Sequence, residues 1–366
     1  MKNLSQLQLA AVLCTALAGP SALAQSASSV TISGLVDAYA GSRQLSGGTR
    51  QSKVDSSGLS TSQINFDGRE DLGDGLRAEF ALGLFLRPDD GGQGRFNGDT
   101  FFGRNAYVGL GGNFGTVRLG RQGTGNFLNF MRTNSFGDSA PFGPTFLHTW
   151  MSAIAQGPQF VSVGTPPTSR ALTGTLGTSD SAWNNSLVYI SPSLGGTVLQ
   201  AQWAPGEVDG VGKRFGASAF YTGGPLVLGL ATEQIGANSV PASGPAAALI
   251  SQQSTWHVSG AYAFGFGRLS AGLINTQRDY TTVTDDRMRT VHLGVTIPVG
   301  AGSVMAQIAN SSQQPDVGNE VTRTTTSVGY SYRFSKRTDA YAVLMHDQFT
   351  GQSSGSTLGV GMRHRF

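Results

Sequence analysis

Apolar and polar residues alternate with a period of two along much of the chain. From Leu76 to Arg87 every second residue is apolar, and Arg77 falls on the opposite face. The same alternation recurs in residues 327–334 and 358–366. A period of two with apolar residues on one face only predicts β-strands whose two faces meet different solvents.

Short and long connections alternate between these segments. The short ones are rich in turn-forming residues and lie at 69–75, 111–115, 191–196, 222–225, 264–267, 298–302 and 335–338. The long ones are polar and rich in glycine, and they lie at roughly 43–58, 88–100, 123–182, 206–213, 236–253, 279–286, 313–322 and 350–355. This arrangement predicts about sixteen strands. An even number of strands places both ends of the sheet on the same side.

These features predict an all-β fold, a transmembrane antiparallel β-barrel of about 16 strands in a bacterial outer membrane. In lipid every backbone N–H and C=O must be paired, and only a closed sheet pairs all of them without a helix. We therefore expect the last strand, which ends at Phe366, to pair with the first strand near residues 29–42. Phe366 would then be anchored in the aromatic girdle at the membrane edge.

The first 24 residues have the pattern of a secretory signal peptide. Lys2 precedes an apolar stretch from Leu9 to Ala18, and small residues follow before Gln25. We expect cleavage after residue 24, which leaves 25–366 as one β-barrel domain. The only cysteine, Cys14, lies in the removed segment, so the mature chain would have no thiol for a disulfide, a metal or a nucleophile.

Composition and charge narrow the possible functions further. The 52 glycines favour strands and turns, and no run of 18 apolar residues follows the signal segment, which argues against membrane helices. The formal net charge of +3 comes without a basic patch, so no nucleic-acid partner is expected. The five histidines have no metal-site spacing and no nucleophile motif is present, so we expect neither an enzyme nor a cofactor.

Five stretches of the sequence resemble the Gram-negative general diffusion porins, particularly those of betaproteobacterial type. They lie at residues 28–41, 66–80, 101–122, 327–343 and 359–366. The resemblance implies a sixteen-stranded barrel, a homotrimer in outer-membrane lipid and lipopolysaccharide, and passive diffusion of small hydrophilic solutes and ions. It also implies that the final phenylalanine is the signal that the outer-membrane assembly machinery reads.

The resemblance further implies that the third loop, 123–182, folds into the lumen and narrows it. In the family, acidic residues of this loop face arginines on the barrel wall, and such charged rings tune ion preference. The expected constriction comprises Arg77, Arg104, Arg118 and Arg121 on the wall, Gln63 and Asp67 on a neighbouring strand, and Arg132 and Asp138 on the loop. Because Gln63 stands where the family usually has an arginine, we expect only a mild preference for anions.

Three other functions are consistent with a β-barrel of this kind. A substrate-specific channel would need a line of aromatic and polar residues along the lumen. A surface adhesin would act through the long loops alone. An outer-membrane hydrolase would need a catalytic constellation and would usually have a smaller barrel.

Overall fold

The computed structural model describes residues 28–150, 181–207, 209–237, 250–280 and 285–366. Its strands are β1 (Ser29–Arg43), β2 (Gln51–Ser56), β3 (Gln63–Gly73), β4 (Leu76–Arg87), β5 (Gly92–Gln93), β6 (Asn105–Gly112), β7 (Gly115–Gly123), β8 (Ala182–Ile190), β9 (Thr197–Ala204), β10 (Arg214–Gly223), β11 (Leu226–Gly236), β12 (Ile250–Phe264), β13 (Gly267–Tyr280), β14 (Asp286–Val299), β15 (Gly302–Pro315), β16 (Val321–Arg333), β17 (Thr338–Phe349) and β18 (Gly355–Arg365). Its helices are α2 (Gly125–Thr133) and α3 (Pro144–Thr149). The expected signal segment 1–24 lies outside the described residues, as does 151–180 of the third loop.

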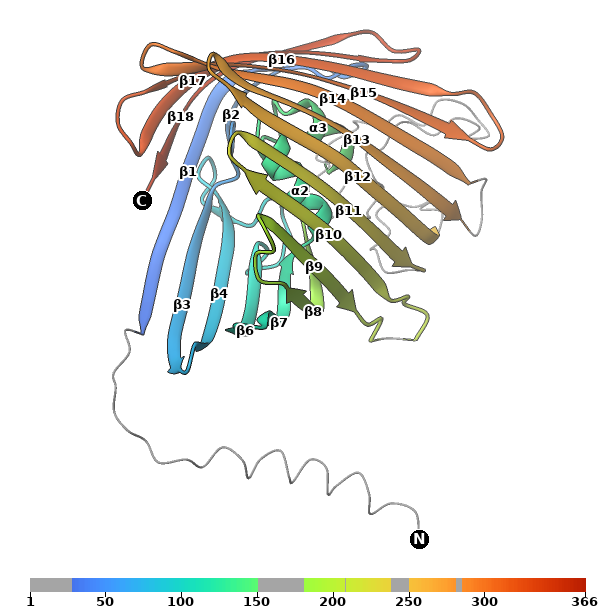
Figure 1. The fold of residues 1–366 in the computed structure, drawn as a ribbon. Helices are drawn as coiled ribbons and strands as arrows, with labels where there is room; N and C mark the ends of the chain where they lie inside the picture. The colour runs from blue at the N-terminus through green and yellow to red at the C-terminus, as the bar shows by residue number, and fades with distance from the viewer. Residues whose placement is uncertain (1–27, 151–180, 208, 238–249, 281–284) are drawn as a thin grey trace.

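The strands form one closed antiparallel barrel (Figure 1). β2 and β3 both pair with β1 and together occupy one position beside it, and β5 pairs only with β4. The barrel therefore has sixteen strand positions, as the sequence pattern predicts. One boundary was wrong. Part of the connection expected at 43–58 is strand β2, because its backbone continues the ladder with the second half of β1.

The barrel closes where β1 meets β18. Leu35 lies opposite Arg365 at one end of this ladder, and Ser42 lies opposite Leu358 at the other. Beyond the ladder, Phe366 and Gly34 exchange backbone hydrogen bonds with N···O distances of 3.0 Å. The Phe366 ring covers Gly34, where even a Cβ atom would collide with it. The glycine thus makes room for the aromatic ring that ends the strand.

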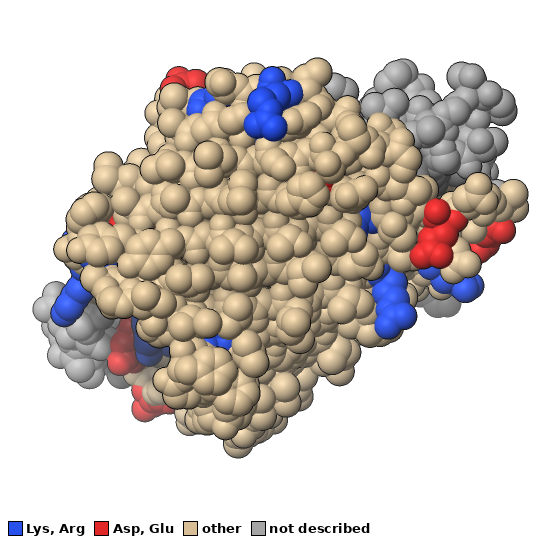
Figure 2. All heavy atoms as spheres, turned by 90° about the horizontal axis from the view of Figure 1, so that it is seen from above, with Lys and Arg blue, Asp and Glu red and all other residues tan. Residues whose placement is uncertain are grey.

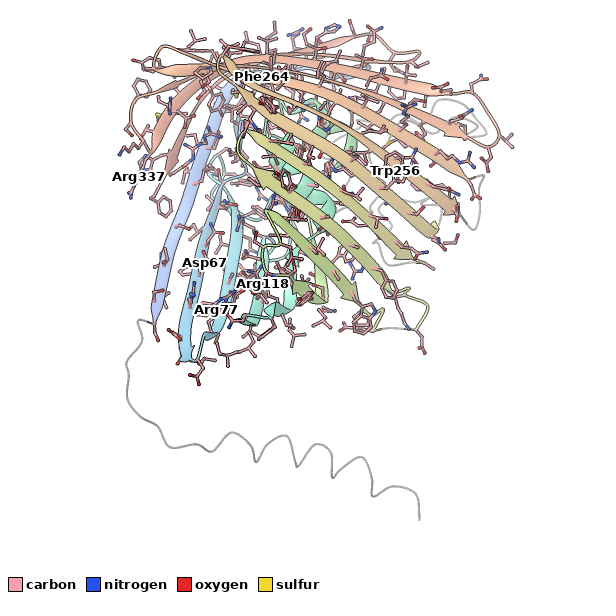
Figure 3. All side chains as sticks on the ribbon, viewed as in Figure 1. Asp67, Arg77, Arg118, Trp256, Phe264 and Arg337 are labelled. Carbon is pink, nitrogen blue, oxygen red and sulfur yellow. The ribbon has the colours of Figure 1, made fainter. Side chains whose placement is uncertain are left out.

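The outer face of the barrel is apolar. On β17, Leu344 is 56% exposed, whereas its neighbour Met345 points inward and is fully buried. The face drawn in Figure 2 has few charged side chains across its middle, and they gather toward its edges. Trp256 and Phe264 are both exposed on the outer face of β12 (Figure 3). A strand of eight residues, such as β6, spans about 27 Å. This length is close to the height of the apolar band, about 25 Å, between the two aromatic girdles of such barrels.

The helices α2 and α3 lie inside the barrel (Figure 1). α2 contacts β10, β11 and β12, and α3 contacts β14, β15 and β16. Among the described residues, no helix combines the length and the apolar character that a membrane crossing requires. The described part of the segment that follows β7, residues 124–150, therefore fills part of the lumen.

Candidate pore constriction

The first part of the third loop is fixed to the wall by hydrogen bonds. Thr124 caps α2 by accepting a hydrogen bond from the Phe127 N–H, and the Glu233 carboxylate accepts one from the Asn126 N–H at 3.1 Å. Further along the helix, the Thr133 hydroxyl donates to Ser259 at 2.9 Å. A carboxylate at the N-terminus of a helix also meets the positive end of its dipole. These contacts hold α2 along the inner side of β11 and β12.

The second part of the loop is held by aromatic packing. Phe130, Phe146 and Trp150 are buried, and the rings of Phe130 and Trp150 lie 4.4 Å apart. This cluster packs against Ile274 and Met345, which are apolar residues on the inward face of the barrel. Apolar residues on a lumen wall would be exposed to water without the loop. They mark where the loop docks.

His148 of α3 is buried between two hydroxyl groups of the wall. Its Nδ1 lies 2.7 Å from Ser311 Oγ, and its Nε2 lies 2.8 Å from Thr325 Oγ1. Burial, together with the nearby Arg323, lowers the pKa of His148 to about 3. The ring is therefore neutral at physiological pH, and its two nitrogens connect the loop to the wall by hydrogen bonds.

The segment after α2 reaches back to the strands near the seam. The Thr61 N–H donates to the Asp138 carboxylate at 3.2 Å, and the Ser139 hydroxyl donates to the Gly58 carbonyl at 2.5 Å. Phe142 meets the Tyr39 ring edge to face at 5.0 Å. The described part of the loop is thus attached both to β10–β12 and to the strands near the seam.

Asp37 on β1 organises the backbone that receives the loop. Its carboxylate accepts hydrogen bonds from three consecutive backbone N–H groups, those of Gly58, Leu59 and Ser60, at 2.9–3.0 Å. The Tyr341 hydroxyl donates a fourth. This turn separates β2 from β3 and leads to Thr61, so Asp37 fixes the place where Asp138 binds.

Arg104 and Asp138 interact electrostatically on the side of the lumen formed by β3 and the turn before it. Arg104 immediately precedes β6 and donates to Asn65 Oδ1 at 2.9 Å. Its guanidinium interacts electrostatically with Asp138 on the loop and with Asp67 on β3. Burial raises the pKa of Asp138 above its ordinary value, and the Thr61 hydrogen bonds and Arg104 oppose that rise.

Arg77 and Arg118 share one carboxylate on the wall. Arg118 Nε lies 2.6 Å from Glu79 Oε1, and Arg77 Nε lies 3.7 Å from Glu79 Oε2. The Arg118 guanidinium also lies over the Tyr107 ring at 4.6 Å. Figure 3 shows Arg77, Arg118 and Asp67 in the same region of the barrel. Arg77 is the second residue of β4, so this group lies toward the end of the barrel that carries the short turns.

The remaining expected residues have different surroundings. Gln63 and Asp67 occupy the inward face of β3, and Asp67 is exposed to the lumen. Arg121 is buried at an irregularity of β7, where its guanidinium donates to the Gly103 carbonyl at 2.7 Å and to Asn184 Oδ1 at 2.6 Å. It does not join Arg118 in the lumen.

Arg132 lies at the far end of α2. It occupies the last turn of the helix and is exposed, and its guanidinium lies 4.1 Å from the centre of the Phe220 ring. The Phe220 ring faces the lumen from β10 and is itself 3% exposed. The loop thus brings one guanidinium to the inner face of β10, three strand positions from β7, which carries Arg118.

The model for Gram-negative porins matches residues 9–352 of this chain. The chain belongs to the Gram-negative porin family. Outer membrane porin protein 32 of Delftia acidovorans is 30% identical over 95% of this chain and 91% of its own length. The solved anion-selective porin from Comamonas acidovorans is 26% identical, with a TM-score of 0.74 over 93% of this chain and all of its own. The trimer form of OmpT from Vibrio cholerae has the same fold, with 16% identity and a TM-score of 0.66 over 93% of this chain and all of its own.

The porin is an outer-membrane channel and not an enzyme. Sequence reasoning missed the residues that hold its loop in place, above all Asp37 and His148. Asp37 carried a usable signal, because it is a charged residue in the middle of an alternating strand. His148 carried none, since its partners Ser311 and Thr325 are more than 160 residues away.

Proposed function

We propose that this porin passes small hydrophilic solutes by diffusion with a mild preference for anions. The observation that carries the proposal is that Arg77 and Arg118 share the single carboxylate Glu79. This group of three side chains therefore carries a net positive charge near the short-turn end. In a water-filled channel such a charge attracts anions and repels cations over about 8 Å at physiological ionic strength.

Further along the lumen, the Arg104 and Asp138 pair forms the constriction. These groups have opposite charge, so together they add little to the preference. Gln63 contributes no charge to the same wall. Asp67 offsets part of the positive charge, and Arg132 on the loop adds to it. Arg121 holds the wall together and contributes little to selectivity.

The comparison with known porins supports this reading. One solved relative is described as an anion-selective porin, and it is 26% identical to this chain over nearly all of its length. The preference proposed for this porin is mild because guanidiniums and carboxylates occur together along the lumen, as in the group formed by Arg77, Arg118 and Glu79.

The assembly proposed for the porin is a homotrimer in outer-membrane lipid and lipopolysaccharide. A trimeric form is described for OmpT of Vibrio cholerae, which shares the fold. The mature domain would comprise residues 25–366 after removal of the signal peptide 1–24. Phe366, which is 44% exposed at the seam, would serve as the signal for the assembly machinery.

Solute diffusion separates a general pore from a substrate-specific channel. Liposomes that contain the porin would be mixed with sugars and organic acids of increasing size, and their swelling rates would be followed. A general pore gives rates that fall smoothly with solute size and do not saturate. A saturable rate for one solute class would favour the specific channel instead.

A further inference from the structure

Many arginines near the lumen have a carboxylate partner. Arg77 and Arg118 share Glu79, and Arg363 and Arg365 share Asp339. Arg132 and Arg268 differ, since within the described ranges neither guanidinium lies within 4 Å of a carboxylate. Burial lowers the pKa of Arg132, which lies on the loop.

These two arginines lie next to each other. The Arg268 guanidinium donates a hydrogen bond to the Arg132 carbonyl. Arg268 belongs to the inward face of β13, beside the short turn at 265–266. This bond attaches the end of α2, which carries Arg132, to the wall at β13.

A hollow of about 420 Å³ opens beside Arg132 on the lumen side of the wall. Its lining combines one cation, two hydroxyl groups and apolar side chains. The lining residues are Arg132, Ser193, Gly196, Val198, Phe220, Thr222 and Val227. A volume of this size is typical of small-molecule sites, which combine an apolar wall with a few polar groups that fix orientation.

The Phe220 ring determines how the cation is presented. The Arg132 guanidinium is held 4.1 Å from the ring centre, a distance at which cation–π attraction stabilises it. A planar guanidinium fixed in this way keeps N–H donors in the geometry that a carboxylate accepts in a bidentate manner. Less side-chain entropy is then lost when an anion binds.

We propose that this hollow is a transient binding site for small organic carboxylates with an apolar body. The carboxylate would bind Arg132, whose backbone Arg268 holds in place, and the apolar body would lie against Val198 and Val227. The hydroxyl groups of Ser193 and Thr222 would accept or donate further hydrogen bonds. The inference rests on the proposed function, because it names a class of anion that the pore would hold as it passes.

An anion without a sizeable apolar body would not use the whole site. Chloride or acetate can neutralise Arg132, but it leaves the valines in contact with water. Benzoate covers them as well, and each buried apolar Å² contributes about 25 cal/mol. The site should therefore rank benzoate above acetate at equal charge.

Single-channel recording tests this ranking. Benzoate or acetate would be added at equal concentration on the short-turn side of the wild-type porin, and the dwell time of current interruptions would be measured. We expect benzoate to dwell about tenfold longer than acetate, a ratio that corresponds to about 1.4 kcal/mol. Equal dwell times in the wild type would overturn the proposal without any variant.

Variants assign the effect to this hollow. Arg132→Gln should shorten the benzoate dwell time about tenfold, and Arg132→Lys should shorten it less, because it keeps the charge and loses the planar fork. Arg268→Gln should also shorten it. Arg337→Gln, in a short turn at the same end, serves as the matched control and should leave it unchanged. Benzoate dwell times that Arg132→Gln and Arg268→Gln both leave unchanged would place the binding elsewhere.

Failure of this inference and failure of the proposed function give different results. If the pore prefers cations in a salt gradient while benzoate dwell still depends on Arg132, the anion preference fails and the site stands. If the pore prefers anions and benzoate behaves like acetate, the site fails and the proposed function stands.

Discussion

The hydroxyl of Tyr341 donates a hydrogen bond to the carboxylate of Asp37, with 2.5 Å between the two oxygens. Tyr341 lies on β17 and Asp37 on β1, and β18 runs between them. The bond therefore crosses the closing strand on the inner side of the seam. The same carboxylate holds the turn that binds Asp138, so the closure of the barrel and the position of its constriction depend on one residue.

Replacing Asp37 should destabilise both the seam of the barrel and the turn that binds Asp138. Asp37→Ala leaves three N–H groups, two of them buried, and one hydroxyl without their acceptor, at a cost of about 1–3 kcal/mol for each buried group. We expect a clear fall in the temperature at which the barrel unfolds in detergent, followed by heat-modifiable electrophoretic mobility. Tyr341→Phe removes only the fourth bond and should cost about 1 kcal/mol. Equal effects of the two variants would contradict this account of the turn.

Substituting the wall arginines should separate selectivity from structure. Arg104→Gln removes the charge that faces Asp138, so the ratio of anion to cation permeability in planar bilayers should fall. Arg121→Gln removes a buried clamp that bonds Gly103 and Asn184. It should lower thermal stability and leave the permeability ratio near that of the wild type. If Arg104→Gln lowered only the stability and Arg121→Gln lowered only the permeability ratio, the roles assigned to these two residues would be wrong.

The anion preference should increase in acid because of Asp138. Burial raises the pKa of this carboxyl above 3.8, so in the folded protein it takes up a proton at a higher pH than a free aspartate does. As the pH falls through that raised value, the loop loses its negative charge and the lumen becomes more positive. Reversal potentials measured from pH 7 to pH 4 should follow this change.

Two variants test that assignment. Asp138→Asn is neutral at every pH, so it should show a stronger anion preference at pH 7 and a flatter pH dependence. Asp67→Asn also removes a negative charge from the lumen but keeps Asp138, so the acid dependence should persist. An Asp138→Asn variant with the full wild-type pH dependence would show that another group titrates.

Stability should fall below pH 6.5 in part because of His148. Its pKa is about 3 in the folded protein and 6.5 as the ordinary value, so between these values the unfolded chain binds the proton and the folded protein does not. Stability is then lost as the pH falls, by up to about 1.4 kcal/mol per pH unit. His148→Gln keeps an amide that can bond Ser311 and Thr325. Its unfolding temperature should depend less on pH between 6.5 and 4, with little difference from wild type at pH 8.

The barrel was predictable because the same constraint acts on every strand and is visible in the residues of that strand alone. Lipid outside and water inside impose the same alternation on every strand, as at Leu344 and Met345. Turn residues such as those at 74–75 mark the short connections directly. The inward positions of Arg77 and Arg118 also follow from the two-residue period of their strands. The chemistry of the final strand likewise indicates that Phe366 is paired.

The docking of the loop could not be predicted in the same way. It depends on contacts between residues far apart in the chain, such as His148 with Thr325 and Asp138 with Thr61. Apolar residues such as Ile274 and Met345 break the expected polar lining, because the loop covers them. Arg121 shows a further limit. An irregularity in β7 shifts the register after Gly120, so the alternation that places Arg118 does not extend to it.

The central claim concerns the sign of the field inside the lumen. It is tested most directly by the reversal potential of the wild-type porin in a planar bilayer with a KCl gradient at pH 7. The account predicts a reversal potential shifted toward the equilibrium potential of chloride, with a modest ratio of chloride to potassium permeability. A reversal potential shifted toward the equilibrium potential of potassium would contradict it.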